Sequence, residues 1–442
     1  MGSIKKLFWF LAVTPLLALA AGNNFQISAI NPNGQIFWTN AFPSGVCTVE
    51  AATQLNGANG QTTWIPQQNY FTTNSAGAGV FSPSPGNGFF RLLAVNISTN
   101  TPQAYTNLVQ SYGILHTIAG NGDAGYSDPG EDVTNYWQPG FEGGYATNAA
   151  LSRPHFAMED NFSNVFIVDK DSDSVLKVTP DGRIHTVAGT HAISNGPDIS
   201  TLATNVAMNT PNGLWVRGDG TLYVLDTGNG KVRRLDTNGM LTTLFTDSSG
   251  ISGGRGLWVN TNESLIYYCS KSHLRQWTPA GGTANLNSQF TDLGNIIIGG
   301  TNIVATDRSD NSVWLVNTNS GARTILFGTP EAAGTNLVVD GSLALTNSLY
   351  GVRGVWQPPI GGYFLATDYG AQFLYVDVTG IIHIFVNGQN DDHAGDGQWF
   401  YSPANYFFGQ LRSVSMDNQG NLIIVENDTG YVRRIDFQRL TP

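Results

Sequence analysis

The chain has 442 residues, of which 41% are hydrophobic, and its 32 acidic side chains outnumber its 21 basic ones. This length and hydrophobic content suffice for a large core and for more than one ordinary domain. A net charge of −11 at pH 7 makes nucleic acid and anionic lipid surfaces unfavourable partners. The 52 glycines and the charged fraction of only 12% favour many short strands joined by tight turns over long helices.

Residues 1–20 have the pattern of a secretory signal peptide. Lys5 and Lys6 precede an apolar run over residues 7–19, and an Ala-Leu-Ala sequence supplies a cleavage site. A membrane anchor is the alternative, but Pro15 interrupts a run that is already short for a bilayer. The sequence therefore predicts a secreted or periplasmic protein with no membrane span after cleavage, and we expect a monomer.

Residues 23–100 contain short β-like runs separated by Asn-Gly and Pro-Gly turns. The runs FQISAI, GQIFWTNA, VCTVEAAT and GFFRLLAVNIS are rich in β-branched and aromatic residues, as strands are. The pattern resembles small β-sandwich domains of the fibronectin type III kind, which implies an accessory domain. Residues 101–112 are expected to form a linker.

From residue 151 onward one phrase recurs: a strand, a Gly turn, an apolar strand that usually ends in Asp, a third strand, another Gly turn and a fourth strand. Copies with four strands are expected at residues 155–189, 213–245, 256–286, 295–328 and 354–388. A sixth copy at 413–437 has only three strands, and GILHTIAG at 113–120 matches the fourth strand of the first copy. This early strand is therefore expected to complete the last copy, and circular closure removes exposed sheet edges.

The second copy carries the features of a known family. PNGLWVRGDGTLYVLDTGNGKVRRLDTNGMLTTL at 211–244 resembles the NHL repeat, and HTIAGNGDAGYSD at 116–128 resembles a glycine-rich connector of secreted bacterial members. The resemblance covers residues 113–437 and implies an all-β fold: a six-bladed β-propeller closed by an N-terminal strand and preceded by the small β-sandwich. The family includes binding scaffolds and a few enzymes, so the resemblance alone does not choose a function.

In such a propeller the first strand of each copy lines the central channel, and the long connectors gather on the face where these strands begin. Three arginines that converge there in an acidic protein favour a site for a carboxylate, sulfate or phosphate group. The alternative is that each arginine pairs with an acid at the end of a second strand, such as Asp307 or Asp368. Both can hold at once. The residues expected at the channel mouth are His155, Asn212, Arg255, Asn295, Arg353 and Arg412.

One segment has the spacing of a metal-binding loop. Asp169, Asp171 and Asp173 follow the pattern of a calcium loop, but Ser174 and Pro180 replace the glycine and glutamate that the motif requires. The same acids also coincide with ordinary positions of the repeat. We therefore expect no cofactor, with calcium at these aspartates as the alternative.

His155 is the one candidate catalytic residue at the expected mouth. Some six-bladed enzymes that resemble this fold hold zinc with three channel-facing histidines, whereas His116, His185 and His383 fall in outer strands that should be exposed. No nucleophile elbow, HExxH or P-loop motif is present. The alternative to a binding protein is a lyase or hydrolase. It would bind an anionic substrate through the three arginines at the channel mouth and use His155 as a general acid or base.

Two connectors rich in Asp and Gly flank the closure of the ring, and aromatic residues follow both. Trp137 follows the first connector, and Trp399 and Tyr401 lie in the second. Exposed rings beside carboxylates are typical of sugar-binding surfaces, and the alternative is that the rings pack onto neighbouring blades. With the connector-rich face, these features predict a secreted scaffold that binds an extracellular glycan or protein.

Overall fold

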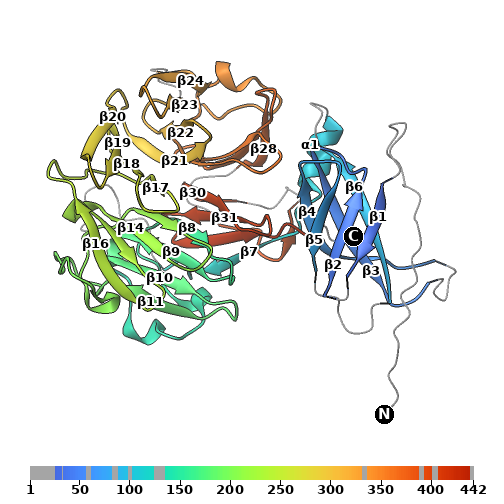
Figure 1. Cartoon of the computed structure of the whole chain (residues 1–442), viewed down its shortest axis with the longest axis horizontal. Helices are drawn as coiled ribbons and strands as arrows, with labels where there is room; N and C mark the ends of the chain where they lie inside the picture. The colour runs from blue at the N-terminus through green and yellow to red at the C-terminus, as the bar shows by residue number, and fades with distance from the viewer. Residues whose placement is uncertain are drawn as a thin grey trace, which may run out of the picture.

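Figure 1 shows the computed structural model, which describes residues 25–31, 33–55, 61–81, 88–97, 102–123, 135–330, 336–387, 393–400 and 407–438. The predicted signal peptide lies outside these residues. The described part is almost entirely β, with the α-helix α1 (Pro102–Val109) and six short 3-10 helices: η1 (Pro139–Phe141), η2 (Ala146–Asn148), η3 (Lys170–Ser172), η4 (Ala203–Asn205), η5 (Thr227–Asn229) and η6 (Ala344–Thr346). No helix in this part of the chain has the length and apolar character needed to cross a membrane.

Two three-stranded antiparallel sheets precede the repeats, and we call them the N-terminal unit. One contains β1 (Gln26–Ile30), β2 (Gln35–Thr39) and β5 (Gly77–Val80), and the other contains β3 (Gly45–Ala52), β4 (Ile65–Thr72) and β6 (Phe89–Asn96). The two sheets share a core around Trp38, Cys47 and Val49. Strand β3 is buried along its whole length because its other face, with Val46, packs against the repeats.

The described repeat region forms six antiparallel sheets. The first sheet contains β8 (Pro154–Glu159), β9 (Val165–Asp169), β10 (Ser174–Val178) and β11 (Ile184–Ala188). The second contains β13 (Gly213–Val216), β14 (Leu222–Asp226), β15 (Lys231–Leu235), β16 (Met240–Thr246) and the short outer strand β12 (Thr201–Leu202). The third contains β17 (Leu257–Val259), β18 (Ile266–Ser270), β19 (His273–Thr278) and β20 (Gly282–Asn287).

The last three sheets follow the same order. The fourth contains β21 (Leu293–Gly299), β22 (Asn302–Asp307), β23 (Ser312–Asn317) and β24 (Arg323–Gly328). The fifth contains β25 (Val352–Trp356), β26 (Tyr363–Thr367), β27 (Gln372–Val376) and β28 (Ile382–Asn387). The sixth contains β30 (Leu411–Met416), β31 (Leu422–Glu426), β32 (Tyr431–Ile435), β7 (Ile114–Ala119) and the short β29 (Gln398–Trp399).

The first strands of the six sheets form a closed ring. Strand β8 contacts β13, β13 contacts β17, β17 contacts β21, β21 contacts β25, β25 contacts β30, and β30 contacts β8. Glycines permit the close approach: a Cβ at Gly213 would lie 2.4 Å from the carbonyl oxygen of Arg255, and one at Gly354 would lie 3.0 Å from the nitrogen of Val414. Second strands such as VFIVD, LYVLD and LIIVE are buried at every residue, as expected for sheets covered on both faces. The arrangement is propeller-like.

The sixth sheet joins the two ends of the repeat region. Strand β7 pairs antiparallel with β32, so that His116 lies opposite Arg434 and Leu115 lies opposite Ile435. The fourth strand that the last repeat lacks therefore comes from the segment that GILHTIAG predicted. Because the first strand is hydrogen-bonded to the last repeat, the ring has no free edge at this seam.

Four connectors between sheets continue a sheet instead of forming simple loops. In each, one residue pairs with the first residue of an outer strand or with the residue just before that strand, and the connector residue that follows is buried. The pairs are Tyr145 with Arg183, Leu202 with Met240, Leu343 with Ile381 and Trp399 with Ile114, and the buried residues that follow are Ala146, Ala203, Ala344 and Phe400. The connectors thereby cover outer edges that would otherwise expose unpaired backbone groups.

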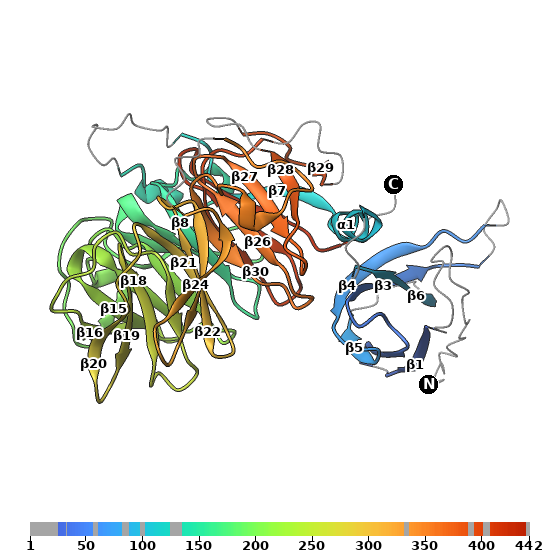
Figure 2. The same ribbon diagram turned by 90° about the horizontal axis from the view of Figure 1, so that it is seen from above.

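Helix α1 lies between the N-terminal unit and the repeats (Figure 2). The linker expected at 101–112 is thus a helix packed on the fifth and sixth sheets, with Tyr112 fully buried. The hydroxyl of Tyr105 donates a 2.7 Å hydrogen bond to the carbonyl of Ile384, and the ring stacks on His383 at 4.4 Å. The expectation that His383 is exposed is wrong, because α1 covers the outer strand on which it lies.

Candidate axial ligand site

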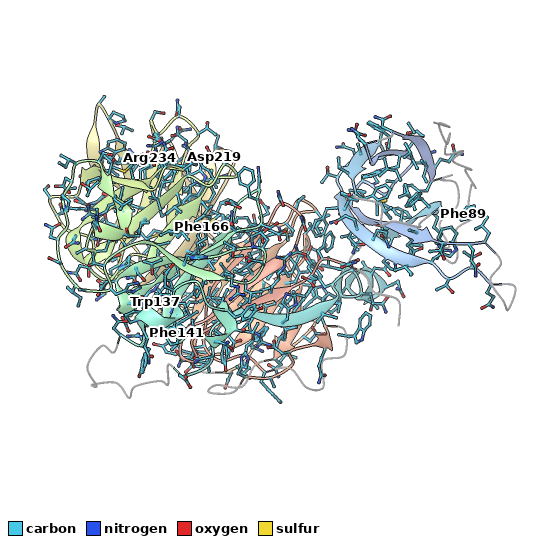
Figure 3. The ribbon with its side chains drawn as sticks, turned by 90° about the horizontal axis from the view of Figure 1, so that it is seen from below. Phe89, Trp137, Phe141, Phe166, Asp219 and Arg234 are labelled. Carbon is cyan, nitrogen blue, oxygen red and sulfur yellow. The ribbon has the colours of Figure 1, made fainter. Side chains whose placement is uncertain are left out.

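The connectors and the hairpin turns occupy opposite ends of the sheets. Figure 3 shows Trp137 and Phe141, which belong to the connector before β8, at one end, and Asp219 and Arg234 at the other. Asp219 lies in the turn between β13 and β14. We call the end that carries the connectors and the starts of the first strands the connector face.

The six residues predicted at the channel mouth all lie where the first strands begin on the connector face. His155, Asn295, Arg353 and Arg412 lie in β8, β21, β25 and β30. Asn212 directly precedes β13, and Arg255 lies two residues before β17. Five of the six are buried, with Arg353 only 2% and Arg412 6% exposed. The side chain of Arg255 is 14% exposed and is the most accessible of the three arginines.

Asp368 is the centre of the charged network at this face. This carboxylate is fully buried and follows β26, the second strand of the fifth sheet. Its Oδ2 lies 2.7 Å from Arg308 Nε and 2.9 Å from Arg353 Nε, and its Oδ1 lies 3.2 Å from Arg412 Nη1. One acid therefore holds three guanidinium groups, two of them from neighbouring first strands.

Asp292 extends the network to Arg255. Its two oxygens lie 3.5 Å from Arg255 Nη1 and 3.2 Å from Arg308 Nη1. Arg308 also donates to the hydroxyl of Tyr369 and packs over its ring at 4.2 Å. We call Arg255, Arg308, Arg353 and Arg412, with Asp292 and Asp368, the axial arginine cluster.

Sequence reasoning missed Arg308. It follows Asp307 at the end of β22, whereas the residues expected at the channel mouth were taken only from the starts of the first strands. Its position next to the expected acid was the available signal, because residues that follow a second strand lie on the same face as the start of the first strand.

Several nitrogens of the cluster lack hydrogen-bond partners within the described protein. They are Nε of Arg255, Nε and Nη1 of Arg353 and Nε of Arg412. Two oxygens, Oδ1 of Asn212 and Oδ1 of Asp368, also accept no hydrogen bond. Arg353 Nε is close enough to Asp368 for ionic attraction but is not aligned for a hydrogen bond. Buried donors that remain unsatisfied are costly, so such a concentration of them requires an explanation.

The local environment disfavours the charged form of two of the four arginines. Burial, and then the neighbouring Arg255 guanidinium, lower the pKa of Arg353 well below its usual value. Burial lowers the pKa of Arg255 as well, against the opposing effect of Asp292 and Asp368. The pKa of Arg308 is raised instead, because Asp368 and Tyr369 outweigh the effect of its burial. The lowered pKa values of Arg255 and Arg353 therefore reflect chiefly their burial, and both guanidinium groups remain protonated at physiological pH.

His155 is placed as a buried structural residue. It is 3% exposed, and its Nδ1 donates a 2.9 Å hydrogen bond to the carbonyl oxygen of Arg153. Burial, followed by the charges of Lys170 and Arg255, lowers the pKa of His155 well below its usual value. The imidazole is therefore neutral near pH 7 and has little capacity to act as an acid or base there.

Two other acids that end second strands pair with arginines of their own sheet. Asp226 Oδ2 lies 2.7 Å from Arg233 Nε, and Glu426 Oε1 lies 2.8 Å from Arg433 Nη1. All four side chains are fully buried. Pairing of this kind fixes the repeat internally, unlike the shared pairing around Asp368.

The three aspartates with calcium-loop spacing each have partners in the protein. Asp169 Oδ2 accepts hydrogen bonds from the Ser152 nitrogen at 2.9 Å and the Ser172 hydroxyl at 2.8 Å. Asp171 forms ion pairs with Arg153 and Lys170, and Asp173 accepts a hydrogen bond from the Thr210 nitrogen at 2.7 Å. Within the residues that the structure describes, no three His, Cys, Asp or Glu side chains are grouped so as to hold a metal ion.

Replacing Asp169 with asparagine is expected to change how stability depends on pH. Burial raises the pKa of Asp169 to about 7, so between about pH 4 and 7 the folded chain keeps a proton that the unfolded chain has lost. Stability from this group therefore falls as pH rises through that window. Because the amide does not titrate, Asp169→Asn should gain about 1 kcal/mol or more relative to wild type between pH 5 and pH 8.

Urea unfolding of both proteins at the two pH values, with and without a chelator, checks this expectation. Parallel pH dependence of the two proteins would contradict it. If chelation destabilises only the wild type, calcium binds at Asp169 and the expectation of no cofactor is wrong.

Of the aromatic residues predicted to contact sugars, Trp137 lies in the connector before β8 and Trp399 lies in the short outer strand β29. Trp137 is partly buried, stacks on His191 at 4.8 Å and meets the edge of Phe141 at 5.7 Å. Trp399 is partly buried and pairs with Ile114 through β29. Tyr401 lies outside the described residues. The described geometry does not bring these two tryptophans to the axial arginine cluster.

A groove of about 360 Å³ lies between the sixth and first sheets. His116 and Arg434 line it from the sixth sheet, and Tyr145, Ser163 and Thr179 line it from the side of the first. It contains no residue of the axial arginine cluster, so the two features are separate.

Comparisons with known proteins give the fold and no family. No family model matches the chain, and no curated protein matches it. A structural genomics protein of unknown function from Bacteroides thetaiotaomicron VPI-5482 aligns with a TM-score of 0.58 and 14% identity, over 93% of this chain and 97% of that one.

Two further solved structures are described as auxiliary nutrient binding proteins. The one from Bacteroides ovatus ATCC 8483 has a TM-score of 0.54 and 13% identity, covering 91% of this chain and 93% of its own. The one from Bacteroides thetaiotaomicron VPI-5482 has a TM-score of 0.53 and 11% identity, covering 93% and 97%. At these identities the likeness shows the fold, and the coverage means that it includes most of the N-terminal unit as well as the repeats.

Proposed function

We propose that this chain is a secreted or periplasmic binding protein that holds an extracellular ligand, a glycan or a protein, on its connector face. In this proposal the repeats are a six-bladed NHL-type β-propeller, and the N-terminal unit is a β-sandwich of the fibronectin type III kind. The observation that carries the proposal is the axial arginine cluster, where four buried guanidinium nitrogens from three sheets converge and keep no hydrogen-bond partner.

The solved structures support a binding role. Two chains that align with this one over more than nine-tenths of its length are described as auxiliary nutrient binding proteins. Rigid sheets that hold a ligand site among connectors are a common arrangement for recognition. A nutrient glycan is therefore the first ligand class to test.

The position of His155 favours binding over catalysis. A lyase or hydrolase at the axial site would need this residue as acid or base, yet it is buried and its Nδ1 is engaged by a backbone carbonyl. Its lowered pKa also makes it a weak base near neutrality. We therefore propose that the arginines hold a ligand without transforming it.

The purified chain without residues 1–20 is expected to bind at least one member of a glycan library saturably. The bound glycan should be recovered chemically unchanged. Isothermal titration measures binding, and mass spectrometry of the recovered ligand detects conversion. Turnover of a sugar, lactone or peptide that His155→Gln abolishes would overturn the binding proposal in favour of an enzyme.

A further inference from the structure

The axial arginines together keep more unpartnered nitrogens than Arg233 and Arg433, the two fully buried arginines that pair within their own sheets; of these two, Arg433 keeps one, its Nε. Arg233 is fully buried, yet its Nε donates to Asp226, its Nη1 to Pro197 and Thr243, and its Nη2 to Gly196. These acceptors satisfy all three nitrogens of that guanidinium group. A structural arginine in this fold can therefore fill its hydrogen bonds.

The axial arginines do not fill theirs. Arg353 and Arg412 are at least nine-tenths buried, and between them they retain three nitrogens without hydrogen-bond partners, while Arg255 retains one. A buried donor without a partner lowers stability, and more so when the donor is charged. Internal packing alone leaves these donors unexplained.

The balance of charged groups in the cluster also favours an anionic ligand. Four guanidinium groups make ion pairs with only Asp292 and Asp368 in the cluster. Asp307 is also nearby, but its two oxygens accept the backbone N–H groups of Thr291 and Asp292 at 2.7 and 2.9 Å, and it forms no ion pair among the described residues. Positive charge is therefore in excess within a chain whose net charge is −11.

We propose that the axial arginine cluster is an anion site that takes a carboxylate, sulfate or phosphate group of the extracellular ligand. The inference rests on the proposed function, because it names the part of the ligand that the connector face holds. Guanidinium groups bind such groups through paired N–H donors, and the bound oxygens supply the acceptors that the cluster lacks. An anion fits this site better than a cation because four of the unpartnered atoms are guanidinium nitrogens that carry positive charge, against two unpartnered oxygens, Oδ1 of Asn212 and Oδ1 of Asp368.

Arg255 is the residue of the cluster best suited to a test by substitution. It is the most exposed of the three first-strand arginines, and its one acid partner, Asp292, keeps a second partner in Arg308. Arg255→Gln therefore leaves no buried carboxylate unpaired. Arg217→Gln is the matched control, because it removes the same charge from the turn after β13, at the opposite end of the sheets.

Titration with sodium sulfate against sodium chloride at constant ionic strength tests the inference. We expect saturable sulfate binding by the wild type and by Arg217→Gln, and binding weaker by about tenfold to a hundredfold in Arg255→Gln, the effect of one lost charge-assisted contact. A general effect of sulfate on stability would be equal in all three proteins. Equal binding in all three, or none in the wild type, would overturn the anion site.

Glucose, glucuronic acid and glucose 6-sulfate separate the two proposals. If both acidic sugars bind and Arg255→Gln weakens the binding of each, the site recognises the anionic group, whether it is a carboxylate or a sulfate. If glucose binds equally well and the substitution has no effect, the anion site is wrong while the binding function stands. If sulfate binding depends on Arg255 but the chain converts a substrate, the anion site stands and the binding proposal falls.

Discussion

Replacing Asp368 with asparagine is expected to lower the free energy of unfolding by about 3–5 kcal/mol, the usual effect of removing one partner from a buried ion pair. The carboxylate is fully buried and is the only acid in ion-pair contact with Arg353 and Arg412 among the described residues. Asparagine keeps the size of the side chain but removes the charge that holds two first strands together. Urea unfolding followed by tryptophan fluorescence measures the change.

Asp292→Asn is the matched comparison for this experiment. Asp292 is 16% exposed and is paired with Arg255 and Arg308, so its loss should cost clearly less. Added sulfate should also restore part of the stability lost in Asp368→Asn, since it would supply negative charge to the same arginines. Equal and small losses in the two variants would contradict the central role given to Asp368.

Replacing Phe437 with alanine is expected to cost about 3–5 kcal/mol and to loosen the junction between the N-terminal unit and the ring. The ring of Phe437 is 1% exposed, stacks on Phe71 of β4 at 4.2 Å and lies 5.1 Å from Tyr112. It follows β32, the strand that pairs with β7 to close the ring. The substitution therefore opens a cavity where the closing seam, the segment after α1 and the N-terminal unit meet.

Phe71→Ala removes the other ring of the stacked pair. Phe71 is only partly buried, so we expect a smaller loss, and the double variant should lose less than the two single losses combined because the rings contact each other. Limited proteolysis should then separate the N-terminal unit from the ring faster in Phe437→Ala than in wild type. Additive losses and unchanged cleavage would show that the two rings are not coupled.

The repeat pattern predicted the strands well because neighbouring sheets bury both faces of each sheet. Second strands such as VFIVD and LYVLD are therefore mainly apolar, and Gly turns follow them at a fixed spacing. The repeated pattern can for this reason be recognised in the sequence. The same regularity allowed the match between residues 113–120 and the fourth strand of the first copy. Strand β7 accordingly pairs with β32.

The features that sequence reasoning missed depend on contacts between distant segments. Tyr145, Leu202, Leu343 and Trp399 occupy the same position in four connectors, yet they contribute only one or two paired residues each, too few to produce a strand pattern. Helix α1 has only eight residues, and its burial comes from sheets far along the chain. Short segments of this kind are specified by tertiary packing and leave little periodicity.

The candidate site was predicted in part for a similar reason. Arg255, Arg353 and Arg412 follow from the common start of the first strands, which the repeat defines. The sharing of Asp368 by three arginines could not be predicted, because it depends on which carboxylates lie between neighbouring sheets. Arg308 reaches the cluster from a different turn, and only the folded chain brings it there.

The most direct test of the account is a crystal structure of the chain without residues 1–20, grown with and without selenate, an anomalous scatterer that substitutes for sulfate. The account predicts an anomalous peak within hydrogen-bond distance of Arg255 and of the unpartnered nitrogens of Arg353 or Arg412, present only with selenate. Crystals that bind selenate only at surface lysines, with the axial arginines unchanged, would contradict the claim that this cluster is a ligand site.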